Sequence, residues 1–189
     1  MIKIMEWTDK RSLEHTLDIL HSGGIIIYPT DTLYGFGCDS KNKDSIQRIN
    51  HLKNRTGPMS VMASSKKVVQ TWLNVKEEEK LDILKVLDGG TTIIVPILKG
   101  IVSEDICSSN NNLGIRIPKH LFCKKLSENF PNPIVTTSVN LTNMPAMTDP
   151  ILIKNQFSGS VDLIIEDGII SGSGSNIQLY KNGKWKKIR

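Results

Sequence analysis

The chain has few aromatic residues and only three cysteines, Cys38, Cys107 and Cys123, which are widely spaced and form no Cys-x-x-Cys pair. An odd, scattered set of this kind is typical neither of a disulfide framework nor of a zinc site. The histidines also lack the spacing of metal ligands, so we predict no protein-bound metal site. Apolar runs fall far short of the roughly 20 residues of a membrane span, and the start resembles no signal peptide. We therefore expect a cytoplasmic protein that makes no use of a membrane.

The remaining composition is that of an ordinary globular protein, with 189 residues, 39% hydrophobic and 23% charged. This length suits one sizeable core, so we expect a single domain over residues 1–189. Of the 24 basic residues, five lie between Lys181 and Arg189, and the other 19 equal the number of acids. A basic tail of this kind suits phosphate or RNA, although a solvated terminus explains the same lysines.

Short apolar runs rich in Ile and Val recur along the chain and are bounded by Gly and Pro, which is typical of strands buried on both faces. They cover residues 25–27, 93–95, 113–117, 134–135 and 163–165. Apolar residues at helical spacing predict helices near residues 13–20, 46–52, 81–87, 119–129 and 149–157. Asn182-Gly183 predicts a tight hairpin turn near the end. Strands interleaved with helices indicate an α/β fold with a mixed sheet.

Two common nucleotide-binding loops, the P-loop and G-x-G-x-x-G, are missing, and so is the G-x-S-x-G nucleophile elbow. A nucleotide would therefore have to be held by side chains from several loops. Four segments place polar groups where a strand or helix ends, and they cover residues 28–35, 53–55, 133–140 and 171–176.

The first two segments each allow two interpretations. Thr30 and Thr32 alternate with Asp31, so an extended chain would put both hydroxyls on one face, but the same residues also cap helices. Lys53 and Arg55 would face the same way if the chain extends after its helix, and two converging cations need an anion such as phosphate between them. The alternative is that they are favourable cations at a helix C-terminus.

The later segments also allow both a functional and a purely structural interpretation. Thr136, Ser138 and Asn140 share one face of a strand end and could form a site at the carboxyl edge of the sheet, or an ordinary capped turn. The N–H groups of residues 171–176 could cradle an anion, although Gly/Ser loops are common. Arg116 lies inside an apolar strand and needs a counter-charge, either from an acidic side chain or from a bound carboxylate.

In this order, the segments resemble the YrdC-like family of threonylcarbamoyl-AMP synthases in its short, single-domain form. The resemblance runs from about Gly23 to Arg189. It rests on Tyr28-Pro-Thr-Asp-Thr-Leu-Tyr-Gly35, Lys53-x-Arg55, Gly114-Ile-Arg116-Ile-Pro118, Thr137-Ser138-Val-Asn140, Asp167-Gly168 and the Ser175 loop. It implies a twisted mixed sheet with flanking helices around a basic concave cavity.

The resemblance also implies a reaction, in which L-threonine, bicarbonate and ATP with Mg²⁺ give threonylcarbamoyl-adenylate and pyrophosphate. A partner transferase then modifies adenosine 37 of tRNA, and the basic tail suggests tRNA or double-stranded RNA as a further partner. By position, the catalytic group would be Lys53, Arg55, Ser138 and Asn140. Threonine would be bound by Thr32, Arg116, Ser138 and Ser175. The nucleotide would be bound by Lys53, Arg55, Asn112, Asn140, Thr148 and Arg189.

Two other hypotheses remain open. One is a carbamoyl-adenylate transferase relative, although such modules normally belong to longer chains with zinc-finger-like cysteines. The other is an RNA-binding module without catalysis, which would not need all four catalytic residues. The chain departs from the family pattern at Thr56-Gly57, where about four residues are common before Pro58, and at Met62, where some members place a histidine. We also expect the C-terminal domain of the longer family form to be missing, because the sequence stops at Arg189.

Overall fold

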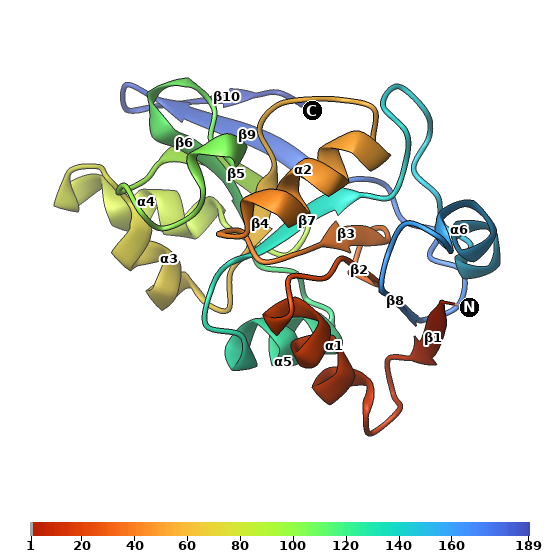
Figure 1. The fold of residues 1–189 in the computed structure, drawn as a ribbon. Helices are drawn as coiled ribbons and strands as arrows, with labels where there is room; N and C mark the ends of the chain where they lie inside the picture. The colour runs from red at the N-terminus through yellow and green to blue at the C-terminus, as the bar shows by residue number, and fades with distance from the viewer. Residues whose placement is uncertain (1) are drawn as a thin grey trace.

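The fold is a mixed sheet with helices on both faces (Figure 1), and the computed structural model describes residues 2–189. The ten strands of this part of the chain lie in the order β1-β8-β2-β3-β7-β4-β6-β5-β9-β10. The strands are β1 (Lys3–Glu6), β2 (Ile26–Tyr28), β3 (Gly35–Gly37), β4 (Ser60–Met62), β5 (Thr91–Pro96), β6 (Asn112–Arg116), β7 (Ile134–Ser138), β8 (Leu163–Glu166), β9 (Asn176–Lys181) and β10 (Lys184–Lys187). The helices are α1 (Ser12–His21), α2 (Lys43–Leu52), α3 (Lys66–Trp72), α4 (Glu77–Val86), α5 (Leu121–Asn129) and α6 (Pro150–Phe157), with 3₁₀ turns at η1 (Glu104–Ile106) and η2 (Ser109–Asn111).

The central strands are buried on both faces, as their apolar runs predict. Ile26 and Ile165 pack into one apolar cluster, while their neighbours Ile27 and Ile164 pack into a second cluster on the opposite face. This alternation is the period of two that a strand imposes on its side chains. It explains why these runs contain almost no polar residue.

Each face of the sheet has its own helices. Helices α1 and α5 pack against each other below the sheet in Figure 1, and contribute Leu20, Phe122 and Leu126 to the first cluster. Helices α2, α3, α4 and α6 contribute to the second cluster, for example through Ile46 and Phe157. The longest helices have ten residues, so no helix within residues 2–189 is long and apolar enough to cross a membrane.

The sequence predicts the long elements correctly and misses the short ones. All five predicted helices and the terminal hairpin are present, and Asn182 and Gly183 take the positive φ angles, 52° and 74°, of the predicted turn. Strands β1, β3 and β4 and helix α3 were not predicted. Strand β3 is Gly-Phe-Gly, and its strand conformation comes from pairing with β2 and β7 rather than from residue preference.

Candidate functional site

A cavity of about 340 Å³ lies on the sheet face that carries α1 and α5, over strands that those helices leave uncovered. Its floor is a row of residues directly opposite one another on β5, β6, β4 and β7, namely Ile94, Gly114, Ser60 and Thr136. A Cβ atom on Gly114 would lie 2.3 Å from Ser60 Oγ. The small residues in the middle of this row, Gly114 and Ser60, therefore leave open space above the sheet for the cavity.

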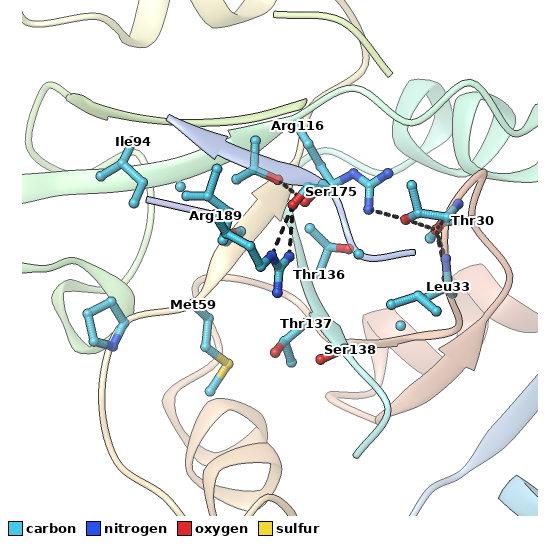
Figure 2. A pocket seen from close by; sticks show the side chains of 18 of the residues that line it. Thr30, Leu33, Met59, Ile94, Arg116, Thr136, Thr137, Ser138, Ser175 and Arg189 are labelled. Carbon is cyan, nitrogen blue, oxygen red and sulfur yellow. Dashed lines mark hydrogen bonds between the residues drawn. The ribbon is translucent and has the colours of Figure 1, made fainter. Parts of the chain in front are cut away.

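The walls of the cavity come from segments that are far apart in the sequence. Figure 2 shows Thr30 and Leu33 on one side, Met59 and Arg189 on another, and Thr136, Thr137 and Ser138 of β7 between them. The Arg116 guanidinium points toward the Thr30 side, whereas Ser175 is hydrogen-bonded to Arg189. No single loop could provide this set, which agrees with the absence of a P-loop from the sequence.

Arg116 is held by a network at the end of β6. Its guanidinium donates to Asp31 Oδ1 at 2.7 Å, to Gly89 O at 3.1 Å and to Thr32 Oγ1 at 3.0 Å. The side chain is buried, and its Nε has no partner in the described part of the chain. An acidic side chain, Asp31, therefore supplies the counter-charge that an arginine in an apolar strand requires.

The two threonines of the first segment lie together at a bend of residues 31–33, where an extended chain was one of the two interpretations. Thr30 Oγ1 and Thr32 Oγ1 are 3.1 Å apart, and both residues line the cavity. The Thr30 hydroxyl closes this bend, because it accepts from the Thr32 and Leu33 N–H groups and donates to Leu33 O. The segment is therefore neither an extended chain nor a helix cap, since strand β3 follows it.

Helix α2 ends in a way that separates Lys53 from Arg55. Asn54 has a φ of 50°, its N–H donates to His51 O, and the Arg55 N–H donates to Asn50 O. These two bonds form a Schellman motif, in which the residue after the cap takes the left-handed conformation. As a result, Arg55 lines the cavity, whereas the Lys53 side chain points away from it, toward the end of β7.

Lys53 is 2% exposed and lies outside the cavity lining. Its Nζ donates to Ser138 O at 2.5 Å, to Asn140 O at 3.0 Å and to Asn140 Oδ1 at 2.7 Å. Burial, and to a smaller extent the nearby charge of Arg55, lowers the pKa of Lys53 to about 8. Lys53 thus stabilises the end of β7 through hydrogen bonds to residues 138 and 140, without entering the cavity.

Ser175 and Arg189 close the remaining side of the cavity. The Ser175 hydroxyl lies 2.7 Å from Thr92 Oγ1, and both side chains are buried. The Arg189 guanidinium donates to Ser175 O from Nε at 3.1 Å and from Nη2 at 2.9 Å. The last residue of the chain is therefore anchored at the cavity.

The Sua5/YciO/YrdC family model, described as "Telomere recombination", matches residues 18–189. The chain belongs to the Sua5/YciO/YrdC family. Proteins named threonylcarbamoyl-AMP synthase, from Photobacterium profundum and Idiomarina loihiensis, are each 27% identical to it. The alignments cover 82% and 85% of this chain and 86% and 89% of those proteins.

Solved structures of the Sua5/YciO/YrdC family share the fold. E. coli YciO has a TM-score of 0.88 and 23% identity, over all of this chain and 95% of YciO. P. abyssi Sua5 complexed with L-threonine also has a TM-score of 0.88, with 21% identity, and this chain spans 57% of that longer protein. The predicted family and the predicted α/β fold are confirmed.

The structure brings together most of the site residues predicted from the family resemblance. Those that line the cavity are Thr32, Arg55, Asn112, Arg116, Ser138, Ser175 and Arg189. Lys53 and Asn140 lie behind Ser138, outside the lining. Thr148 is also outside it, and its carbonyl accepts from the Ile170 N–H.

The cavity does not lie at one carboxyl edge of the sheet, where the residues at the strand ends suggested a site. Strands β4 and β6 are parallel, but β7 is antiparallel to β4. The carboxyl ends of β6 and β7, which carry Arg116 and Ser138, therefore point in opposite directions. The cavity spans the sheet face between these two ends.

Sequence reasoning missed several lining residues, including Thr92, Ser60 and Ile94. The available signal was a hydroxyl or small residue at alternate positions of a buried strand, as at Thr92. Among residues 2–189, no group of three His, Cys, Asp or Glu side chains is placed to hold a metal ion. The lining residues also include neither Asp nor Glu in the described part of the chain.

Proposed function

We propose that this protein is a threonylcarbamoyl-AMP synthase, which joins L-threonine, bicarbonate and ATP. The observation that carries the proposal is the convergence of Arg55, Arg116 and Arg189 on one cavity with no Asp or Glu among its lining residues in the described part of the chain. Arg116 already pairs with Asp31, whereas Arg55 and Arg189 have no carboxylate partner among the described ion pairs. Two such guanidinium groups suit a polyphosphate, which arginine binds in a bidentate fashion.

The proposed reaction needs no nucleophilic side chain. The threonine amine and bicarbonate form a carbamate with loss of water, and a carbamate oxygen then attacks the α-phosphorus of ATP as pyrophosphate leaves. Arg55 and Arg189 would offset the charge that develops on the phosphates, and the cavity would hold the reactants in line. Burial raises the pKa of the Cys38 and Cys123 thiols, which makes neither a ready nucleophile.

We expect Mg²⁺ to enter with ATP. Mg²⁺ prefers oxygen ligands and keeps several waters, and the described lining offers no Asp or Glu side chain to replace them. The ion would therefore be held by phosphate oxygens and water, where it neutralises the charge of the leaving pyrophosphate. The adenylate product would pass to a transferase that modifies tRNA.

The deciding experiment is incubation of the purified protein with ATP, Mg²⁺ and bicarbonate, with and without L-threonine. Pyrophosphate release and mass spectrometry of the adenylate are the measurements. We expect threonylcarbamoyl-adenylate only when threonine is present. Folded protein that binds ATP but releases no pyrophosphate would overturn the proposal, and would favour the RNA-binding alternative.

Replacing Arg189 with alanine is expected to raise the KM for ATP about tenfold or more, because a hydrogen bond to a charged group contributes about 1.5–3 kcal/mol. The substitution keeps the backbone bonds between residue 189 and Ile177. Lys187→Ala is the matched control, since Lys187 is exposed on the same tail and does not line the cavity. An unchanged KM for ATP in Arg189→Ala would mean that Arg189 does not bind the nucleotide.

A further inference from the structure

The orientation of the Asn140 side-chain amide is fixed from two sides. The Lys53 ammonium has only donors, so the amide atom 2.7 Å away from it must be the oxygen, Oδ1. On the other side, Nδ2 donates to Leu141 O at 2.9 Å and to Met144 O at 2.8 Å. A flipped amide would set donors against Lys53 and an oxygen against two carbonyls.

This orientation determines what Ser138 can offer a ligand. Ser138 Oγ lies 2.7 Å from Asn140 Oδ1, which carries no hydrogen, so the serine hydroxyl must donate there. A hydroxyl has one hydrogen and two lone pairs. Ser138 lines the cavity, and toward it the hydroxyl can therefore only accept. An acceptor of this kind suits an N–H or O–H group and is unfavourable for a phosphate or carboxylate oxygen.

Lys53 has no donor left for a phosphate. An ammonium has three hydrogens, and Nζ lies within 3.0 Å of three acceptors, two of them backbone carbonyls. The Nζ atom also lies 5.7 Å from the centre of the Phe36 ring, on the core side. Its position differs from that of Arg55, which reaches the cavity from the same helix end.

We propose that Lys53 is a positioning residue that acts through Asn140 to hold the Ser138 hydroxyl as an acceptor, and that this acceptor receives an N–H of the substrate's amino group. The inference rests on the proposed function. An acceptor at that N–H leaves the nitrogen lone pair free to attack the carbonate carbon. It assigns Lys53 and Ser138 to the amino acid and leaves the phosphates to the arginines.

Binding measurements separate this role from a phosphate contact. Calorimetry with L-threonine and with a non-hydrolysable Mg²⁺–ATP analogue is made on wild type, Lys53→Met, Ser138→Ala and the double variant. We expect each single variant to bind threonine about tenfold more weakly and the analogue within twofold of wild type. The double variant should bind threonine no more weakly than Ser138→Ala. Lys41→Met, at an exposed lysine, is the matched control.

Two further measurements complete the test. One does not depend on whether Lys53→Met folds, and the other shows whether the amino group of threonine is the donor to Ser138. Asn140→Ala removes the relay but keeps both backbone acceptors of Lys53, so it should reproduce the loss of Ser138→Ala even if Lys53→Met does not fold. 3-Hydroxybutanoate, which is threonine without its amino group, should bind wild type and Ser138→Ala equally.

Three results would overturn the inference. They are a tenfold loss of analogue affinity in Lys53→Met, additive losses of threonine affinity in the double variant, and a loss of 3-hydroxybutanoate binding in Ser138→Ala. Product formation by the wild type shows in each case that the proposed function itself stands. Wild-type protein that neither binds threonine nor forms product would overturn both.

Discussion

Arg55→Ala is expected to reduce product formation by at least a hundredfold and to leave the fold intact. Arg55 lines the cavity, where its Nη2 donates to Pro58 O at 3.0 Å and its buried Nε has no partner in residues 2–189. Burial lowers the pKa of Arg55, as expected for a cation that still lacks an anion. Loss of one group that stabilises transition-state charge typically lowers the rate 10²–10³-fold. Threonine-dependent pyrophosphate release is the measurement.

The matched control for Arg55→Ala is Arg48→Ala. Arg48 lies on helix α2, which ends shortly before Arg55 in the chain, and pairs with Asp162 at 3.2 Å, but its side chain is 47% exposed and outside the cavity. An exposed ion pair contributes about 0–1 kcal/mol, so this variant should keep both its fold and its activity. Full activity in Arg55→Ala, with an unchanged circular dichroism spectrum, would contradict the phosphate role of Arg55.

The sequence predicts which segments form the site better than it predicts how each residue faces. The alternation of Thr30 and Thr32 predicts that an extended chain puts both hydroxyls on one face. The hydroxyls do lie together, but because residues 31–33 bend around the Thr30 hydroxyl and not because the segment is extended. The same reasoning failed for Lys53 and Arg55. Asn54 takes the left-handed conformation between them, so the chain turns instead of extending. The signal was present, since asparagine is common at this position of a helix C-terminus.

The floor of the cavity could not be predicted from local pattern. Ser60, Gly114 and Thr136 meet only because β4, β6 and β7 pair in one register, over long separations in the chain. Local preference carries no information on such pairing, which also explains why β3 and β4 were missed. The long apolar runs were predicted because burial on both faces leaves a pattern that does not depend on the partner strand.

Arg116→Met is expected to lower both stability and activity, and a second substitution should separate the two effects. Removing one partner of a buried ion pair leaves the other charge uncompensated, which typically costs 3–5 kcal/mol. The Asp31 side chain is 18% exposed, so water screens part of this loss, and we expect roughly 2–4 kcal/mol in urea unfolding.

Asp31→Asn in the Arg116→Met background removes the stranded carboxylate. Most of the lost stability should return, because the remaining amide carries no charge. Product formation should not return, because Arg116 lines the cavity and its bond to Thr32 Oγ1 orients a hydroxyl proposed to contact threonine. Urea unfolding and threonine-dependent pyrophosphate release are measured on the same preparations. Recovery of activity together with stability would mean that Arg116 supports the cavity wall without binding substrate.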